Sequence, residues 1–367
     1  MNLLRRQYRM RELLLFRSRF FRLAMNWRRV VNFLKVKISW WLRLERVRGL
    51  PIHLHVEPSG SCDQLCLKCQ RFAAIFRDDG RIDGNKLLPF ETYQSVIDEI
   101  GESLLTVRLW HYGAPLQNPD IFRMIEYAKA RHLIVAVSST LSLLNAEKAE
   151  RLVRSGLDYL IVSLDGATPE SYRRNHGVDH FERVLGNLTN LLEVRRRLHT
   201  PFPMIDLQFI VMKDNEHEIP HIRELAARLG VDRLSIQRVD ISHLDELRDG
   251  RRGIGDAILP INPEFRLDMS DVLRDRACRL PWEEALVRYS GLVLPCVSDL
   301  RQEWPMGRVG ANGSGGIRDA WNGESFRQLR RRIRADIDAI PMCSTCSVRN
   351  NHNEDIHDSH NEDIHDV

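Results

Sequence analysis

The chain has 367 residues, of which 43% are hydrophobic and 28% are charged, a composition that suits a globular protein with an adequate core. The longest uninterrupted apolar run near the start, Leu13 to Phe16, is too short for a membrane-spanning helix or a secretory signal peptide. The seven cysteines, an odd number, therefore indicate a reducing, cytoplasmic compartment, where metal binding explains them better than disulfides do.

Residues 1–50 carry most of the chain's excess positive charge. They hold 14 Lys and Arg against 2 Asp and Glu, a balance of +12, which leaves 40 of the 54 basic and 48 of the 50 acidic residues for the rest. Leu, Phe and Trp alternate with these basic residues, which predicts an amphipathic segment. It either contacts an anionic membrane surface peripherally or packs on the body of the protein or a partner subunit. No nucleic-acid-binding module accompanies the charge, so no nucleic-acid partner is expected.

From residue 51 to residue 240, strand patterns alternate with helix patterns. The predicted strands are 51–57, 104–111, 133–138, 158–164, 204–212 and 232–240. The predicted helices are 89–103, 120–132, 146–156, 181–198 and 218–230. Six β/α units in about 190 residues are too few for an eightfold barrel. The pattern predicts an α/β fold with a partial (β/α)6 TIM-type barrel.

Capping residues are predicted at the ends of several of these helices. Asn118 is predicted to cap the helix that begins near residue 120, and Asn145 the helix that follows. Asn215 and Glu218 form an N-x-x-E start for the helix over 218–230, which Gly230 should end.

The region after the barrel has a different sequence pattern. Residues 241–277 lose the periodic pattern and are interpreted as a linker. Residues 278–349 predict a small cysteine-rich domain with a hairpin over 284–296, turning at Ser290 and Gly291, and a helix over 323–333. Residues 350–367 duplicate an eight-residue unit rich in His and acidic residues, and we expect a disordered tail, with metal binding as the alternative.

The first cysteine set directly follows the first predicted strand. Cys62, Cys66 and Cys69 are spaced C-x3-C-x2-C, and three thiolates leave one ligand position open at a metal centre. Zinc completed by His53 or His55 is the alternative. Polar residues also follow the next three strands, over 111–115, 138–140 and 163–166, and chemistry in β/α barrels collects at these strand ends.

This loop, placed after strand one of a β/α barrel, resembles the radical S-adenosylmethionine (radical SAM) superfamily. The resemblance implies that the three thiolates bind three irons of a [4Fe–4S] cluster and that SAM binds the fourth. Reductive cleavage of SAM would then give a 5′-deoxyadenosyl radical that abstracts hydrogen from a substrate.

The resemblance also implies SAM contacts. Residues 113–115 lie where the family carries a Gly-Glu-Pro turn, here with Ala114 in place of the acid, and Lys68 is a second departure from the family pattern. Rim and lumen positions add further candidates. The expected SAM-binding residues are Tyr112, Gly113, Ala114, Pro115, Ser138, Ser139, Ser163 and Gln208.

Strand one alternates polar and apolar residues. His53, His55 and Glu57 should therefore share one face, directed into the barrel, where they would contact substrate or form a structural network. Glu57, Asp165 and several rim arginines are equal candidates for a general base, so no catalytic residue is assigned.

The second cysteine set and the residues between its members resemble the SPASM and shorter twitch domains that follow many radical SAM barrels. The resemblance implies that Cys278, Cys296, Cys343 and Cys346 bind one auxiliary [4Fe–4S] cluster with protein ligands alone. This cluster would pass an electron or fix the substrate. A zinc ribbon is the alternative.

Together these features predict a cytoplasmic radical SAM enzyme with two [4Fe–4S] clusters. The expected partners are SAM, a reductant such as flavodoxin or ferredoxin, and a small, sugar-like or peptide substrate. Membrane association through residues 1–50 is the further hypothesis for its location. The alternative function is a non-catalytic iron–sulfur or zinc-binding scaffold or sensor, which Ala114 and Lys68 favour.

Overall fold

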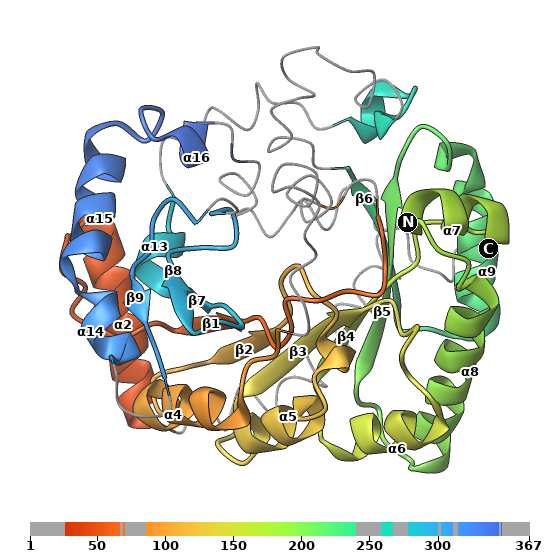
Figure 1. The fold of residues 1–367 in the computed structure, drawn as a ribbon, viewed down its shortest axis with the longest axis horizontal. Helices are drawn as coiled ribbons and strands as arrows, with labels where there is room; N and C mark the ends of the chain where they lie inside the picture. Colours follow the sequence, from red (N-terminus) through yellow and green to blue (C-terminus); the bar gives the residue numbers. More distant parts are fainter. Residues whose placement is uncertain are drawn as a thin grey trace, which may run out of the picture.

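A nine-stranded sheet organises the computed structural model, which describes residues 26–66, 69, 86–239, 258–266, 278–299, 302–310, 315–344 and 346. The strands follow the order β6-β5-β4-β3-β2-β1-β7-β8-β9 (Figure 1). The first six are β1 His53–Val56, β2 Thr106–Leu109, β3 Ile134–Ser139, β4 Tyr159–Ser163, β5 Met204–Val211 and β6 Arg233–Arg238. Each pairs in parallel with the next, which confirms the predicted α/β partial barrel of six units.

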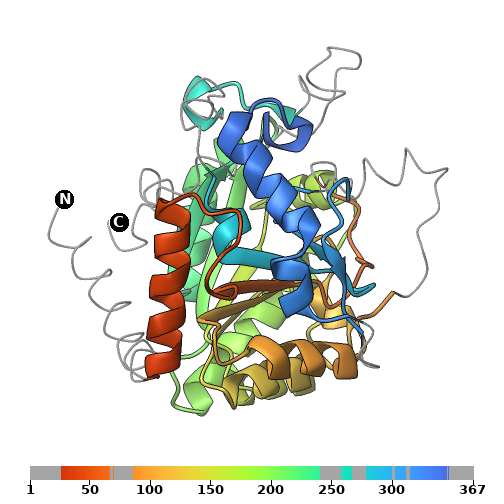
Figure 2. The same cartoon turned by 90° about the vertical axis from the view of Figure 1, so that its left-hand side faces the viewer.

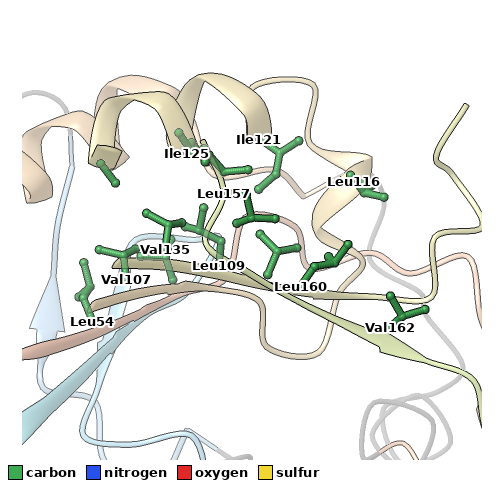
Figure 3. Packing of buried hydrophobic residues seen from close by; sticks show 14 of the residues in the cluster. Leu54, Val107, Leu109, Leu116, Ile121, Ile125, Val135, Leu157, Leu160 and Val162 are labelled. Atoms are coloured by element: carbon green, nitrogen blue, oxygen red, sulfur yellow. The ribbon is translucent and has the colours of Figure 1, made fainter. Parts of the chain in front are cut away.

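Helices cover the convex side of this sheet (Figure 1). They are α4 Phe90–Ile100, α5 Ile121–Lys129, α6 Ala146–Arg154, α7 Pro169–His176, α8 Phe181–Arg197 and α9 Ile219–Leu229. Apolar strand residues such as Leu54, Val107 and Val135 pack with Ile125 of α5 in the buried core (Figure 3). Because strand side chains alternate between faces, the polar residues between them face the concave side.

The C-terminal region joins the same sheet. Strand β7 Glu284–Val287 pairs in parallel with β1, so that His53 lies opposite Glu284. Strands β8 Leu292–Leu294 and β9 Gly307–Arg308 continue it in antiparallel pairs, which confirms the predicted hairpin. Gly291 turns that hairpin at a φ of +76°, where a side chain would strain the backbone. The pairing of β7 with β1 was not predicted.

The remaining elements border this region. Helix α15 Glu324–Asp336 confirms the helix expected over 323–333, and the others are α13 Leu280–Glu283, α14 Ile317–Trp321 and α16 Pro341–Ser344. Short 3-10 turns cover η1 Pro115–Gln117, η2 Glu216–Glu218 and η3 Pro263–Phe265. Helix α2 Trp27–Trp41 lies along the outside of the molecule (Figure 2).

Within the described residues, none of the helices has the length and apolar character needed to cross a membrane.

Two predicted caps are wrong. Asn118 lies two residues before Asp120, the residue at the N-cap of α5. Its side-chain oxygen accepts from the Asp120 amide at 2.9 Å, and its side-chain amide donates to the carbonyl oxygens of Pro58 and Leu88 at 2.8 and 3.0 Å. The side chain of Asn215 accepts from the Met212 amide, so it forms no capping box. Both side chains stabilise loops, because the buried backbone N–H and C=O groups of a loop need hydrogen-bond partners.

Other terminal signals are confirmed. The side chain of Asn145 accepts from the Lys148 amide at the start of α6, and Gly230 ends α9 in the left-handed conformation. Helix α7 was not predicted. It begins with a capping box between Thr168 and Ser171. Much of the proposed linker over 241–277 and all of the tail over 350–367 lie outside the described residues, so the domain boundaries stay predictions.

Candidate active site and second cysteine pocket

The first cysteine loop leaves the carboxyl end of β1, as predicted. The amide of Cys69 donates to the carbonyl of Cys66 at 3.0 Å, so these two cysteines lie close together. All seven cysteines are free thiols. Lys68, the second departure from the family pattern, lies outside the described residues.

The turn over residues 111–115 packs directly on this loop. The Ala114 amide donates to the carbonyl of Ser61 at 2.7 Å. A Cβ atom on Gly113 would lie only 1.8 Å from the carbonyl oxygen of Ser59, so this position requires glycine. The structure thus brings the expected SAM-binding segment Tyr112 to Pro115 against the cysteine loop.

The other expected SAM contacts divide between the two faces of the sheet. Ser163 lies opposite Gln208 in the pairing of β4 with β5, and both are partly exposed. Ser138 of β3 is also partly exposed. Ser139 is buried and its hydroxyl accepts from the Leu141 amide at 3.0 Å. Ser138, Ser163 and Gln208 are therefore better placed than Ser139 to meet a ligand, and all four assignments stay predictions.

A buried histidine contacts one cysteine of the loop. His176, the last residue of α7, places Nδ1 3.3 Å from Cys66 Sγ and stacks on the ring of Tyr172. Its Nε2 lies 3.3 Å from the backbone amide nitrogen of Asp165. Because a thiolate has no proton, Nδ1 must donate to Cys66 when that cysteine is ionised. The sequence did not reveal this contact, since α7 was not predicted.

Asp165 supports this histidine and is otherwise fully engaged. Its Oδ2 lies 3.3 Å from His176 Nε2, and its Oδ1 accepts from the Ile210 amide at 2.8 Å. The side-chain amides of Asn175 and Asn215 donate to its backbone carbonyl. This geometry favours a structural role for Asp165 over the role of general base.

Glu57 is completely buried at the end of β1. It forms a short ion pair with Arg288, which follows β7, and accepts from the Tyr112 amide at 3.3 Å. Burial by itself would raise the pKa of Glu57, but the nearby His111, whose Nδ1 lies 3.6 Å from Oε1, and the charge of Arg288 outweigh it and lower the pKa. Glu57 is therefore ionised and joins the barrel to the C-terminal region.

A second cluster of polar residues lies on the concave face of the sheet. Arg108 Nη1 of β2 donates to Glu284 Oε2 of β7 at 2.9 Å, and Oε1 of that carboxylate lies 3.5 Å from His55 Nδ1. The side chain of Arg108 is 37% exposed, whereas that of Glu284 is buried. The polar layer predicted on strand one therefore exists, and Arg108 reaches an accessible surface. Arg108, Glu284 and Arg288 were missed, although single charges inside apolar strands could have signalled them.

The second cysteine set lines one pocket. Its cysteines Cys278, Cys296, Cys343 and Cys346 lie among the apolar side chains of Leu280, Pro281, Ile333, Ile337 and Met342, and Ser298 adds a hydroxyl. Burial, and then the nearby Cys346, raises the pKa of the Cys278 thiol, and the same causes raise that of Cys296. These thiols are neutral without a metal, and metal binding would release their protons.

The turn over 111–115 also reaches this pocket. His111 Nε2 lies 3.1 Å from the carbonyl oxygen of Val297, next to Cys296, and the Tyr112 hydroxyl donates to the same oxygen at 3.5 Å. One turn therefore contacts both cysteine sites.

The donor sets fit two different iron–sulfur centres. Three thiols on one loop suit a cluster that keeps an open position, and four thiols from separate elements suit a closed one. Among the residues that the structure describes, no three His, Cys, Asp or Glu side chains are arranged to hold a single metal ion. In a four-iron cluster, by contrast, each thiolate binds its own iron.

Comparisons with known proteins agree with this architecture. Residues 56–226 match the model of the radical SAM superfamily, and residues 278–347 match the SPASM iron–sulfur cluster-binding domain. The tungsten-containing aldehyde ferredoxin oxidoreductase cofactor-modifying protein of Pyrococcus furiosus is 22% identical over 81% of this chain and 88% of that protein. The PqqA peptide cyclase of Gluconobacter oxydans is 23% identical over 67% of this chain and 70% of that protein.

The fold is also similar to that of a solved structure. SuiB of Streptococcus suis bound to the precursor peptide SuiA has a TM-score of 0.56 and 15% identity, and covers 81% of this chain and 70% of SuiB. In this family the radical SAM domain binds a [4Fe–4S] cluster and SAM, and the SPASM domain binds an auxiliary cluster. The chain belongs to the radical SAM superfamily and is a radical SAM enzyme with a C-terminal SPASM domain.

Proposed function

We propose that Cys62, Cys66 and Cys69 bind the cluster that cleaves SAM, and that the four cysteines of the second pocket bind one auxiliary [4Fe–4S] cluster. The observation that carries this proposal is the turn over 111–115, which contacts both sites through Ser61 and Val297. A cluster on the first three thiolates would supply the electron that converts SAM to methionine and a hydrogen-abstracting 5′-deoxyadenosyl radical.

The surrounding residues position SAM and exclude side reactions. The close contact of Gly113 with Ser59 supports a role for the turn in holding SAM against the loop. Ala114 can offer only backbone groups, so its carbonyl and that of Gly113 would accept from the SAM amino group without an ion pair. Ser138, Ser163 and Gln208 would bind polar groups of the same ligand.

The substrate would lie against the polar residues of β1, β2 and β7. Arg108 offers a partly exposed side chain, and the ring of Trp110 lies tilted against that of His55 with centroids 5.3 Å apart. These groups favour a polar substrate, either a peptide or a small molecule. The peptide cyclase among the relatives supports a peptide, and the cofactor-modifying protein supports a small molecule.

The electron would come from a reductant such as flavodoxin or ferredoxin, because SAM cleavage consumes one electron for each radical formed. Seven free thiols and two expected iron–sulfur sites favour a reducing, cytoplasmic location.

The test is anaerobic SAM cleavage. Reconstituted protein is reduced with dithionite and mixed with SAM, and 5′-deoxyadenosine is measured by chromatography. We expect product from the wild type and none from Cys62→Ala, with about half of the iron remaining in that variant. Cys278→Ala is the matched control and should lose the other half.

The alternative, a non-catalytic scaffold, predicts fully loaded clusters but no 5′-deoxyadenosine from any form of the protein. Equal product from wild type and Cys62→Ala would contradict the assignment of the first loop.

A further inference from the structure

Helix α2 exposes five large apolar side chains, whereas Val36 lies in the buried core and Phe33 and Trp40 pack against it. Large exposed hydrophobic residues in the described part of the chain are concentrated here, and elsewhere only Leu65 and Ile261 belong to this class. The exposed set is Trp27, Val30, Leu34, Ile38, Trp41 and Leu42, with the two tryptophans 69% and 79% exposed. The first five recur every three or four residues, so they form one stripe along the helix.

The inner face of the same helix is largely polar. Arg29 is buried, and its Nη2 donates to the carbonyl oxygens of Arg131 at 2.6 Å and Gly101 at 3.2 Å. Asn32 exchanges hydrogen bonds with the backbone of Leu50, its amide donating and its oxygen accepting. These bonds fix the rotation of α2, so its apolar stripe faces outward because the inner face is anchored.

Additional contacts hold the helix on the body. Lys37 forms an ion pair with Glu283 at 2.6 Å, and Trp40 packs edge-on against Trp282 with ring centroids 5.2 Å apart. A surface helix normally buries its apolar face and exposes its polar face. The reversed arrangement of α2 therefore marks a docking surface.

We propose that the outer face of α2 docks on an anionic lipid surface. This inference does not depend on the proposed function. The stripe spans the 15 residues of the helix, about 22 Å, with a tryptophan at each end. Interfacial helices carry such a stripe beside basic residues, and tryptophan favours the boundary between lipid and water.

Charge favours lipid over a second copy of the chain. Residues 26–50, which include α2, hold seven Lys and Arg against one Glu, a balance of +6. Two copies that met through this face would bring two such segments together, and these would repel each other. A bilayer with anionic headgroups attracts the same segment and accepts the stripe without needing a shaped groove.

The experiment measures cosedimentation of the reconstituted full chain with vesicles. One preparation is pure phosphatidylcholine, and the other contains phosphatidylcholine and phosphatidylglycerol at about 7:3. We expect binding to the second preparation and at least about tenfold weaker binding to the first, with the difference reduced at high salt.

The decisive variant is Leu34→Gln with Ile38→Gln. Both side chains are about half exposed, so the fold should tolerate the changes, and circular dichroism with thermal unfolding checks that it does. Loss of two inserted aliphatic side chains should weaken binding to the anionic vesicles at least about tenfold. Ile261→Gln, also exposed but far from α2 in the sequence, is the matched control and should bind like the wild type.

Several results would overturn the proposal. Equal binding by wild type and the double variant would show that basic charge alone drives association. Equal binding to both vesicle preparations would exclude selection by headgroup charge. Absence of binding to either, with a dimer in solution that the double variant loses, would identify the stripe as a subunit interface. Absence of binding to either without such a dimer would also reject lipid as the occupant.

Discussion

The two cysteine sites share a neighbouring turn but have opposite surroundings. Next to the first, His176 contacts Cys66 from a buried hydrogen-bond network that includes Asp165. Around the second, the walls are mainly aliphatic, with Ile333 and Ile337 facing the thiols. Polar partners can orient a ligand and change the basicity of a thiolate, whereas an apolar wall excludes water from the site.

This difference matches the two proposed roles. A site that must admit SAM needs donors and acceptors beside the open position, and the turn over 111–115 brings backbone groups to the cysteine loop. A site that only stores or transfers an electron benefits from exclusion of solvent. The two sites contact the same turn, and the following predictions test whether a change near one site alters the properties of the other.

The largest effect on stability is expected at the ion pair that joins the barrel to the C-terminal region. Glu57→Ala leaves the buried guanidinium of Arg288 without its partner, which should lower the free energy of unfolding by about 3–5 kcal/mol. Urea denaturation under anaerobic conditions measures this change. The double change Glu57→Leu with Arg288→Leu removes both charges and should recover most of the loss. No recovery would mean that contacts other than the ion pair join the regions.

Gly113→Ala should damage the first site much more than the second. The added Cβ would meet the carbonyl of Ser59 at 1.8 Å and displace the turn by a large part of an ångström. SAM affinity should fall about 100-fold, since such displacements misplace a bound ligand. Calorimetric titration measures the affinity, and absorption of the auxiliary cluster should not change. Gly186→Ala, where no atom lies within 4 Å, is the control. Unchanged SAM affinity would place SAM away from this turn.

His176→Phe tests the polar surroundings of the first site. Phenylalanine keeps the stacking on Tyr172 but cannot donate to Cys66. Retention of iron at this site should weaken about 10-fold to 100-fold, and its reduction potential should become more negative. A redox titration followed by electron paramagnetic resonance measures the potential, with the auxiliary cluster as internal reference. Equal shifts in both clusters would indicate a general structural effect.

The smallest effect concerns the polar layer on β1. Burial, and then the charges of Arg108, Lys37 and Arg279, lowers the pKa of His53 to about 3 from its ordinary 6.5. As pH falls below 6.5, the unfolded chain binds a proton that the folded chain rejects, so stability declines until pH reaches about 3.

His53→Asn should keep the hydrogen bond to Thr106 and remove this titration. The slope of unfolding free energy from about pH 7 to about pH 5.5 should become shallower by at most about 1.4 kcal/mol per pH unit. Denaturation at several pH values measures the slope. An unchanged slope would mean that His53 is solvated and titrates normally.

Local patterns predicted much of this molecule. Apolar residues at alternating positions located the strands of the barrel, because each strand buries one apolar face against the covering helices. Gly230 ended α9 as expected, since only glycine adopts the left-handed conformation without cost. Asn118 and Asn215 misled the capping predictions because a buried loop uses the same amide to satisfy distant backbone groups.

The sequence by itself determined the cysteine spacing, the order of β/α units and the excess of positive charge in residues 1–50, because these depend on residues close together in the chain. The tertiary structure decided the pairing of β7 with β1, the contact of His176 with Cys66 and the outward rotation of α2. Each of these joins residues far apart in sequence, and the free energy of such contacts comes from burial and hydrogen bonding that exist only after the chain has folded.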